Sequence, residues 1–192
     1  MLNHIGTKSL ETNRLILRRF KMEDAQDMYN NWASDNEVTK YLTWPTHTNI
    51  DVSKQVLAIW IEQYNDLQKY EWAIELKETG SVIGSIGLLN IDNQNENCEI
   101  GYCIGRLYWG KGITAEAAKA VINFGLKEVG FQRITGRHDC ENTASGRVMQ
   151  KCGLTHEGVL RKINKNNKGE LVDCTYYSIL KDELDILGNT IC

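Results

Sequence analysis

Two hydrophobic periodicities divide the chain into predicted strands and helices. Segments in which apolar and polar residues alternate predict strands, whereas apolar residues that recur every three or four positions predict amphipathic helices. The predicted strands span 14–20, 70–77, 81–91, 98–104, 132–139, 154–163 and 171–180. The predicted helices follow Lys21, run from Val52 to near Asp66, and span 114–129 and 143–152.

The order of these elements predicts the fold class. Two helices precede most of the strands, three strands joined by tight turns come next, and a helix, a strand, a helix and a hairpin complete the chain. No internal repeat, low-complexity tract or linker interrupts this order. We therefore expect one α/β (α+β) domain over residues 1–192, with a mixed, mostly antiparallel sheet of about seven strands and helices on both faces.

Composition narrows the functional classes. The chain has 192 residues, of which 42% are hydrophobic, and a net charge of −3, which argues against nucleic-acid binding through the overall field. No apolar run approaches the roughly 20 residues that cross a bilayer, and residues 1–8 form no signal core, so we expect no membrane association and a cytoplasmic location. The six cysteines form no CxxC pair and the histidines are scattered, which predicts free thiols and no metal.

A glycine-rich loop before a predicted helix is the first candidate for chemistry. In Trp109-Gly110-Lys111-Gly112-Ile113-Thr114 the glycines allow backbone N–H groups to approach a ligand closely. The helix that follows offers unpaired donors and a positive dipole end, which suit a pyrophosphate. A tight strand-to-helix turn accounts for the glycines equally well. The spacing matches neither a nucleotide P-loop nor a Rossmann fingerprint.

Four motifs in a fixed order carry a family resemblance. They are Glu99-Ile100-Gly101-Tyr102, Tyr108-Trp109-Gly110-Lys111-Gly112, Glu141-Asn142-Thr143-Ala144-Ser145 and Lys151-Cys152-Gly153-Leu154. Together they resemble the GNAT N-acetyltransferases over nearly the whole chain. Within that superfamily the sequence is similar to the branch that contains the ribosomal-protein alanine and serine N-terminal acetyltransferases.

The resemblance implies acetyl-coenzyme A as cosubstrate and a sheet that is splayed at its centre. The pyrophosphate is expected on the glycine loop, and the pantetheine arm on the free backbone of the strand before it and on the side-chain amide of Asn142. The implied cofactor-binding residues are Tyr102, Cys103, Ile104, Trp109, Gly110, Lys111, Gly112, Ile113, Thr114, Asn142 and Ser145. A backbone N–H near Ile104 is expected to polarise the thioester carbonyl.

Two side chains are candidate catalytic groups. Glu99 matches the position of a catalytic glutamate in histone-acetylating relatives and is the predicted base, although a solvated carboxylate at a strand end is the alternative. Ser145 matches a serine of the ribosomal-protein branch that can protonate the coenzyme sulfur, although a helix cap is the alternative. The tyrosine acid of other relatives falls on Met149, and a glutamate proposed as base in the branch falls on Asn164, so neither can act in this way.

The sequence thus predicts acetyl transfer by direct attack of a primary amine, because no cysteine stands at a matching catalytic position. The preferred acceptor is a protein N-terminal α-amino group, whose pKa of about 8 lets a weak base suffice. A polyamine, an amino acid or an aminoglycoside is the second hypothesis. A catalytically idle coenzyme A sensor or interaction domain is the third. The expected partners are acetyl-coenzyme A and the acceptor, and a homodimer stays open.

Overall fold

The computed structural model describes residues 1–188, so Cys192 and the end of the predicted domain lie outside the described residues. It contains one sheet of eight strands in the order β1-β2-β3-β4-β5-β6-β8-β7, in which only β5 and β6 are parallel neighbours. The strands are β1 (Leu10–Glu11), β2 (Leu15–Arg18), β3 (Tyr70–Leu76), β4 (Val82–Asp92), β5 (Asn97–Ile104), β6 (Arg133–Asp139), β7 (Thr155–Lys165) and β8 (Leu171–Leu180). The predicted mixed sheet is confirmed, and the short strand β1 is the one that the sequence pattern missed.

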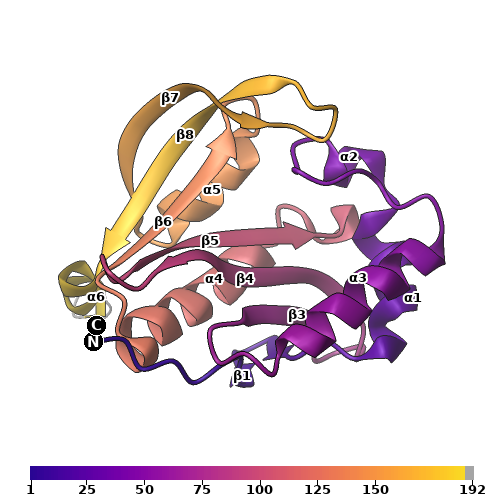
Figure 1. The fold of residues 1–192 in the computed structure, drawn as a ribbon, viewed down its shortest axis with the longest axis horizontal. Coiled ribbons are helices and arrows are strands. Elements are labelled where there is room, and N and C mark those ends of the chain that lie inside the picture. Colours follow the sequence, from indigo (N-terminus) through magenta and orange to yellow (C-terminus); the bar gives the residue numbers. More distant parts are fainter. Residues whose placement is uncertain (189–192) are drawn as a thin grey trace.

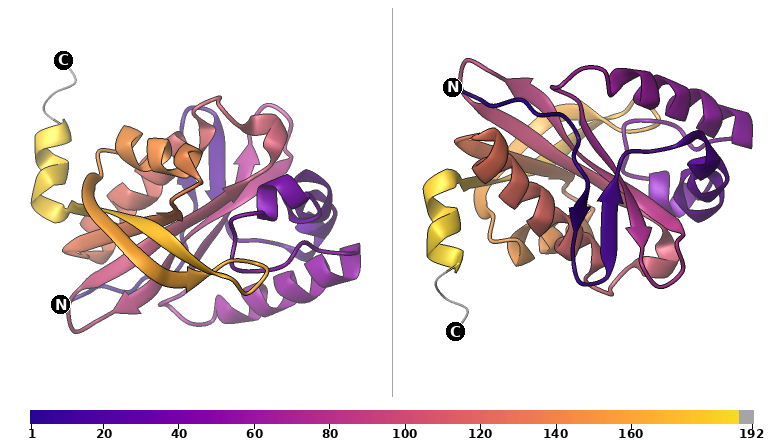
Figure 2. Two further views of the ribbon diagram at one scale, coloured as in Figure 1. Left: turned by 90° about the horizontal axis from the view of Figure 1, so that it is seen from above. Right: turned by 90° about the horizontal axis from the view of Figure 1, so that it is seen from below.

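Helices cover both faces of this sheet, as predicted (Figures 1 and 2). One face carries α1, α2 and α3, and the other carries α4 and α5. The helices are α1 (Ala25–Met28), α2 (Asn36–Thr39), α3 (Ile50–Gln63), α4 (Ile113–Phe124), α5 (Thr143–Lys151) and α6 (Lys181–Gly188). The sequence pattern did not indicate α2 or α6.

Two predicted helices are shorter than their periodicity suggested, because each passes into a π-helical turn. The helix after Lys21 continues beyond α1 as a π turn over Tyr29–Ala33, and α4 continues as a π turn over Gly125–Val129. A Cβ on Gly125 would lie 2.9 Å from Ile134 Cδ1, so this turn packs directly on the sheet. A period of 3.6 residues cannot distinguish such a turn from a continuing α-helix.

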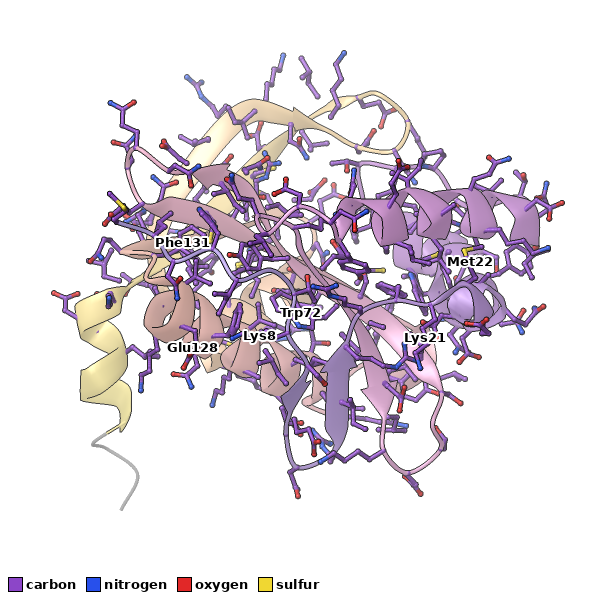
Figure 3. All side chains as sticks on the ribbon, turned by 60° about the horizontal axis from the view of Figure 1, so that its bottom comes forward. Lys8, Lys21, Met22, Trp72, Glu128 and Phe131 are labelled. Carbon is purple, nitrogen blue, oxygen red and sulfur yellow. The ribbon has the colours of Figure 1, made fainter. Side chains whose placement is uncertain are left out.

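Each face of the sheet has its own core cluster. On the α4 face, Trp72 is fully buried, meets Phe124 edge-on at 5.5 Å, and donates from Nε1 to the Lys8 carbonyl at 2.6 Å (Figure 3). On the α3 face, Trp32 and Leu57 are fully buried beneath the helices. The two clusters hold the central strands rigidly from both sides, which fixes the point where the sheet opens.

The sheet opens between β5 and β6. Their parallel pairing covers Asn97 to Ile100 on β5 and Arg133 to Gly136 on β6, and then stops. From Gly101 onward β5 stays on β4 while β6 follows β8, so the two strands diverge, as Figure 1 shows. This confirms the predicted splay and leaves one edge of β5 without a strand partner among the described residues.

Candidate active site

The glycine loop forms the start of α4. Gly110 and Gly112 have φ of 74° and 73°, in the left-handed region, and no atom lies within 4 Å of a Cβ built on Gly110. The first helical bond runs from Glu116 N to the Gly112 carbonyl, so the N–H groups before it have no partner in the helix. The loop therefore presents open backbone donors at a helix N-terminus, an arrangement that fits a pyrophosphate.

The residues of the glycine loop differ in whether their side chains or only their backbone groups are accessible to a ligand. The side chains of Trp109 and Lys111 are exposed, and that of Thr114 is partly exposed. Ile113 is buried in the core and can contribute only its backbone N–H. The predicted phosphate contacts thus rest on the backbone for the glycines and Ile113, and on side chains only for the more exposed positions.

A charged clamp that the sequence analysis missed holds this loop. Glu116, in the first turn of α4, accepts from Thr12 Oγ1 at 2.6 Å, from Arg14 N at 2.9 Å and from Arg14 Nε at 2.7 Å. Arg14 also donates from Nη1 to the Lys111 carbonyl at 3.0 Å. Because about a hundred residues separate the partners, no local pattern could have indicated the clamp.

The free edge of β5 presents alternate backbone groups. Gly105 N donates to the Ile83 carbonyl at 2.9 Å, which makes Gly84 and Ile104 a pair without mutual hydrogen bonds. The backbone of Ile104, like that of Tyr102, therefore points toward the splay, whereas that of Cys103 points toward β4. The Ile104 carbonyl is already used, because Trp109 Nε1 donates to it at 2.9 Å. Its N–H remains directed into the opening.

Asn142 and Ser145 meet Tyr102 at the start of α5. Asn142 is the N-cap, and its Oδ1 accepts from Ser145 N at 3.3 Å, so the capping interaction weighed in the sequence analysis is present. Tyr102 donates from its hydroxyl to the Ser145 carbonyl at 3.0 Å, and its oxygen lies 3.1 Å from Ser145 Oγ. Since a carbonyl can only accept, Ser145 Oγ is the donor in the second contact. Burial raises the pKa of Tyr102 and keeps this phenol protonated.

Glu99 lies on the other face of the sheet in an ion pair. Its Oε1 is 3.0 Å from Arg137 Nε, and its Oε2 accepts from Asn90 Nδ2 at 3.4 Å. The side chain is 17% exposed. Both oxygens of the predicted base are therefore engaged, and a proton taken up by Glu99 would weaken its pair with Arg137.

One cleft of about 360 Å³ passes through the splay and connects these groups. Of the predicted site residues it is lined by Glu99, Tyr102, Cys103, Asn142 and Ser145, whereas the glycine loop lies outside it. The cleft thus joins a hydroxyl pair on the α5 side to a charged and aromatic chamber on the α3 side. Burial raises the pKa of the Cys103 thiol to about 12, which leaves it a poor nucleophile.

The chamber on the α3 side contains residues that sequence reasoning did not select. Glu71 and Lys69 line it together with Trp44 and Trp60. Glu71 alternates with Tyr70 and Trp72, so it lies on the opposite face of β3 from these core residues. In the structure α3 covers that face, and burial raises the pKa of Glu71 to about 7. A glutamate between two large aromatic residues, near the start of a largely apolar strand, was the available signal.

Within 1–188 no three His, Cys, Asp or Glu side chains cluster in a way that could hold a metal ion. No helix in the same range is both long and apolar enough to cross a membrane.

Open backbone donors at a helix start beside a splayed sheet fit a ligand that carries a pyrophosphate, and comparison with known proteins identifies the family of the chain. Residues 14–155 match the acetyltransferase (GNAT) domain, and the chain belongs to this family of acetyl-transferring enzymes. It is 37% identical over 180 residues to the uncharacterized N-acetyltransferase p20 of Bacillus licheniformis, covering 92% of this chain and 98% of p20.

One further sequence relative and one solved structure are also similar to the chain. YdaF of Bacillus subtilis, which its name assigns provisionally as a ribosomal N-acetyltransferase, is 34% identical over 128 residues, covering 67% of this chain and 68% of YdaF. The microcin C7 self-immunity acetyltransferase MccE, solved in complex with acetyl-CoA and AMP, superposes with a TM-score of 0.78 at 25% identity, covering 88% of this chain and 93% of that chain. GNAT acetyltransferases use acetyl-coenzyme A, which is therefore the cosubstrate that the family supports.

Proposed function

We propose that this enzyme acetylates a protein N-terminal α-amino group by direct attack on acetyl-coenzyme A. The observation that carries the proposal is the cleft at the splay, which is lined by the Tyr102 and Ser145 hydroxyls on one side and by charged and aromatic side chains on the other. The similarity to YdaF supports a protein N-terminus as acceptor. The raised pKa of the Cys103 thiol supports direct transfer over an acetyl-enzyme.

In this proposal acetyl-coenzyme A binds along the α4 and α5 side. The pyrophosphate lies on the backbone donors of Gly110 and Gly112 and of the first turn of α4. The pantetheine amides pair with the free backbone edge at Tyr102 and Ile104, and Asn142 Nδ2 donates to them. The Ile104 N–H, which points into the opening, stabilises the negative charge that develops on the thioester oxygen.

The chemical step requires one neutral amine and one proton for the sulfur. The acceptor ammonium first loses a proton, and its nitrogen attacks the thioester carbonyl to form a C–N bond. The C–S bond then breaks, and the departing thiolate takes a proton from Ser145 Oγ, which Tyr102 orients. The second nitrogen proton restores Ser145. The products are the acetylated amine and coenzyme A, with one proton released to water. Positioning both substrates in one cleft supplies much of the rate.

The acid role makes a specific prediction for Ser145. We expect Ser145→Ala to lower kcat by about 100-fold, within the range of general acid–base catalysis, with the KM for acetyl-coenzyme A little changed. The measurement is steady-state thiol release at saturating acceptor. Thr143→Ala, which removes an exposed hydroxyl from the same helical turn, is the control. Full kcat in Ser145→Ala would exclude Ser145 as the acid.

The acceptor is tested by measuring thiol release from acetyl-coenzyme A with a panel of amines. The panel contains peptides with free N-termini, the same peptides with blocked N-termini and a free lysine, and a polyamine, an amino acid and an aminoglycoside. We expect release with free N-termini only, and mass spectrometry should place the acetyl group there. Release only with the small amines would contradict the proposed acceptor. Coenzyme A binding without release for any amine would indicate a sensor, and a trapped acetyl-enzyme would contradict direct attack.

A further inference from the structure

A row of residues across three strands leads from a buried carboxylate to the splay. Glu71 on β3 pairs with Gly87 on β4, and Gly87 pairs with Gly101 on β5. Cross-strand partners project to the same face of a sheet, here the face covered by α3. The second and third members are glycines and add no side chain of their own, and the side chain of Leu89 on β4 borders the row at Gly101, where its Cδ1 lies 3.0 Å from a Cβ built on that glycine.

The carboxylate of Glu71 occupies the start of this path. A Cβ built on Gly87 would lie 2.8 Å from Glu71 Oε2, so the carboxylate lies directly above Gly87. Glu71 is 6% exposed, and what remains open faces the cleft that also reaches Gly101, Glu99 and Ser145. The carboxylate therefore lines the same cleft as the candidate catalytic groups.

Glu71 has few partners for a buried acid. Neither of its carboxylate oxygens accepts a hydrogen bond from the part of the chain that the structure describes, and its nearest cation, Lys69 Nζ, is 3.9 Å from Oε2. Lys69 in turn lies over the Trp60 ring of α3, 5.7 Å from its centroid. A buried carboxylate that lacks donors is costly to maintain for structure alone.

We infer that Glu71 binds the ammonium group of the acceptor and takes the proton that this group must lose before it attacks. This inference rests on the proposed function and names a residue for the base role that the sequence analysis gave to Glu99. Glu99 has both oxygens engaged by Arg137 and Asn90. In Glu71 neither oxygen accepts a hydrogen bond within the described residues, and only Oε2 lies near a cation, Lys69 Nζ at 3.9 Å, so the carboxylate can still bind an ammonium group that enters the cleft. Glu99 and Arg137 then form the wall opposite Glu71.

The titration of Glu71 suits this role. Burial raises its pKa to about 7, and Lys69 lowers it by a smaller amount. The other titratable groups that face it are the Cys103 thiol of β5, the Tyr64 phenol at the end of α3, which donates to the Glu71 carbonyl at 2.9 Å, and Glu99 across the cleft. A base whose pKa lies near neutrality matches an α-amino group of pKa about 8.

The test is the pH dependence of kcat/KM for a peptide acceptor. In the wild type the productive pair is the Glu71 carboxylate with the acceptor ammonium, so kcat/KM should be bell-shaped, with limbs near pH 7 and near the acceptor pKa of about 8. Glu71→Gln should lower kcat/KM at pH 7.5 by about 100-fold. In Glu71→Gln the bell-shaped pH profile should also be replaced by one in which kcat/KM rises with pH as the acceptor amine loses its proton and does not fall at higher pH. Glu71→Asp, which keeps a carboxylate, should retain the bell shape at a lower rate.

A second measurement separates loss of the base from loss of the fold. The raised pKa means that the folded state holds the Glu71 proton between pH 4.5 and about 7 while the unfolded state releases it. Stability is therefore lost as pH rises through this window. Folded Glu71→Gln should have a higher Tm than the wild type at pH 8 and nearly the same Tm at pH 5. Glu78→Gln, at an exposed turn, is the matched control.

Each outcome decides between the two proposals. A wild-type bell that Glu71→Gln leaves unchanged, or that only Glu99→Gln abolishes, overturns the inference about Glu71 and leaves the proposed acceptor intact. Turnover with small amines alone overturns the acceptor, and the same pH comparison with the amine that reacts still decides the role of Glu71. Absence of turnover with every amine overturns both.

Discussion

Replacing both Gly110 and Gly112 by alanine is expected to raise the Kd for acetyl-coenzyme A by about 30-fold or more. Each residue has a φ above 70°, and an L-residue in this region costs roughly 1 to 2 kcal/mol. The free loop can relieve this strain by turning its N–H groups away, and binding must then restore the strained form. Two such residues cost about 2 to 4 kcal/mol, and every 1.4 kcal/mol changes Kd tenfold.

The measurement is isothermal titration calorimetry with acetyl-coenzyme A. The matched control replaces Gly80 and Gly169, which have φ of 69° and 79° and no atom within 4 Å of an added Cβ. This control carries the same backbone strain at turns away from the loop, so it should lose stability and keep its Kd. An unchanged Kd in the Gly110 and Gly112 variant would mean that the loop does not hold the coenzyme.

Whether the sequence could predict a feature of the site depends on how many residues separate the groups that form it. The glycine loop, the helix that follows it and the Asn142 to Ser145 turn lie within short segments, and their residue types already imply their geometry. The splay could be anticipated only through the family resemblance, since no local pattern marks the residue at which β5 stops pairing with β6. The clamp between Arg14 and Glu116 depends on contacts between distant segments, which no periodicity reports.

Glu71 shows why a correct strand prediction can still hide a functional residue. Alternation identified β3 and placed Glu71 on the opposite face of the strand from Trp72, but it gave Glu71 no role. In the structure Glu71 is buried, because α3, which carries Trp60, covers that face of the sheet. A strand buried on both faces needs apolar residues at successive positions, so a carboxylate there marks a site.

Gly84→Ala is expected to lower both stability and coenzyme binding, because the added methyl group would meet the neighbouring strand β5. Gly84 is not in the left-handed region, yet a Cβ on it would lie 2.3 Å from the Cys103 carbonyl oxygen and 2.9 Å from Ile104 Cα. These are backbone atoms and cannot rotate away, so β4 and β5 must separate. Overpacking of this kind costs about 1 to 3 kcal/mol, which lowers Tm by roughly 2 to 12 °C in a chain of this size.

The displacement falls on the segment that is proposed to pair with pantetheine. Gly84→Ala should therefore weaken acetyl-coenzyme A binding by about 10-fold or more, which corresponds to 1.4 kcal/mol, in addition to lowering Tm. Thermal unfolding with and without acetyl-coenzyme A measures both effects, because a ligand that binds only the folded state raises Tm in proportion to its affinity. Gly80→Ala, which meets nothing within 4 Å, should lower Tm modestly and keep the ligand-induced shift. If Gly84→Ala kept that shift as well, the position of β5 at Cys103 and Ile104 would have no part in holding the coenzyme.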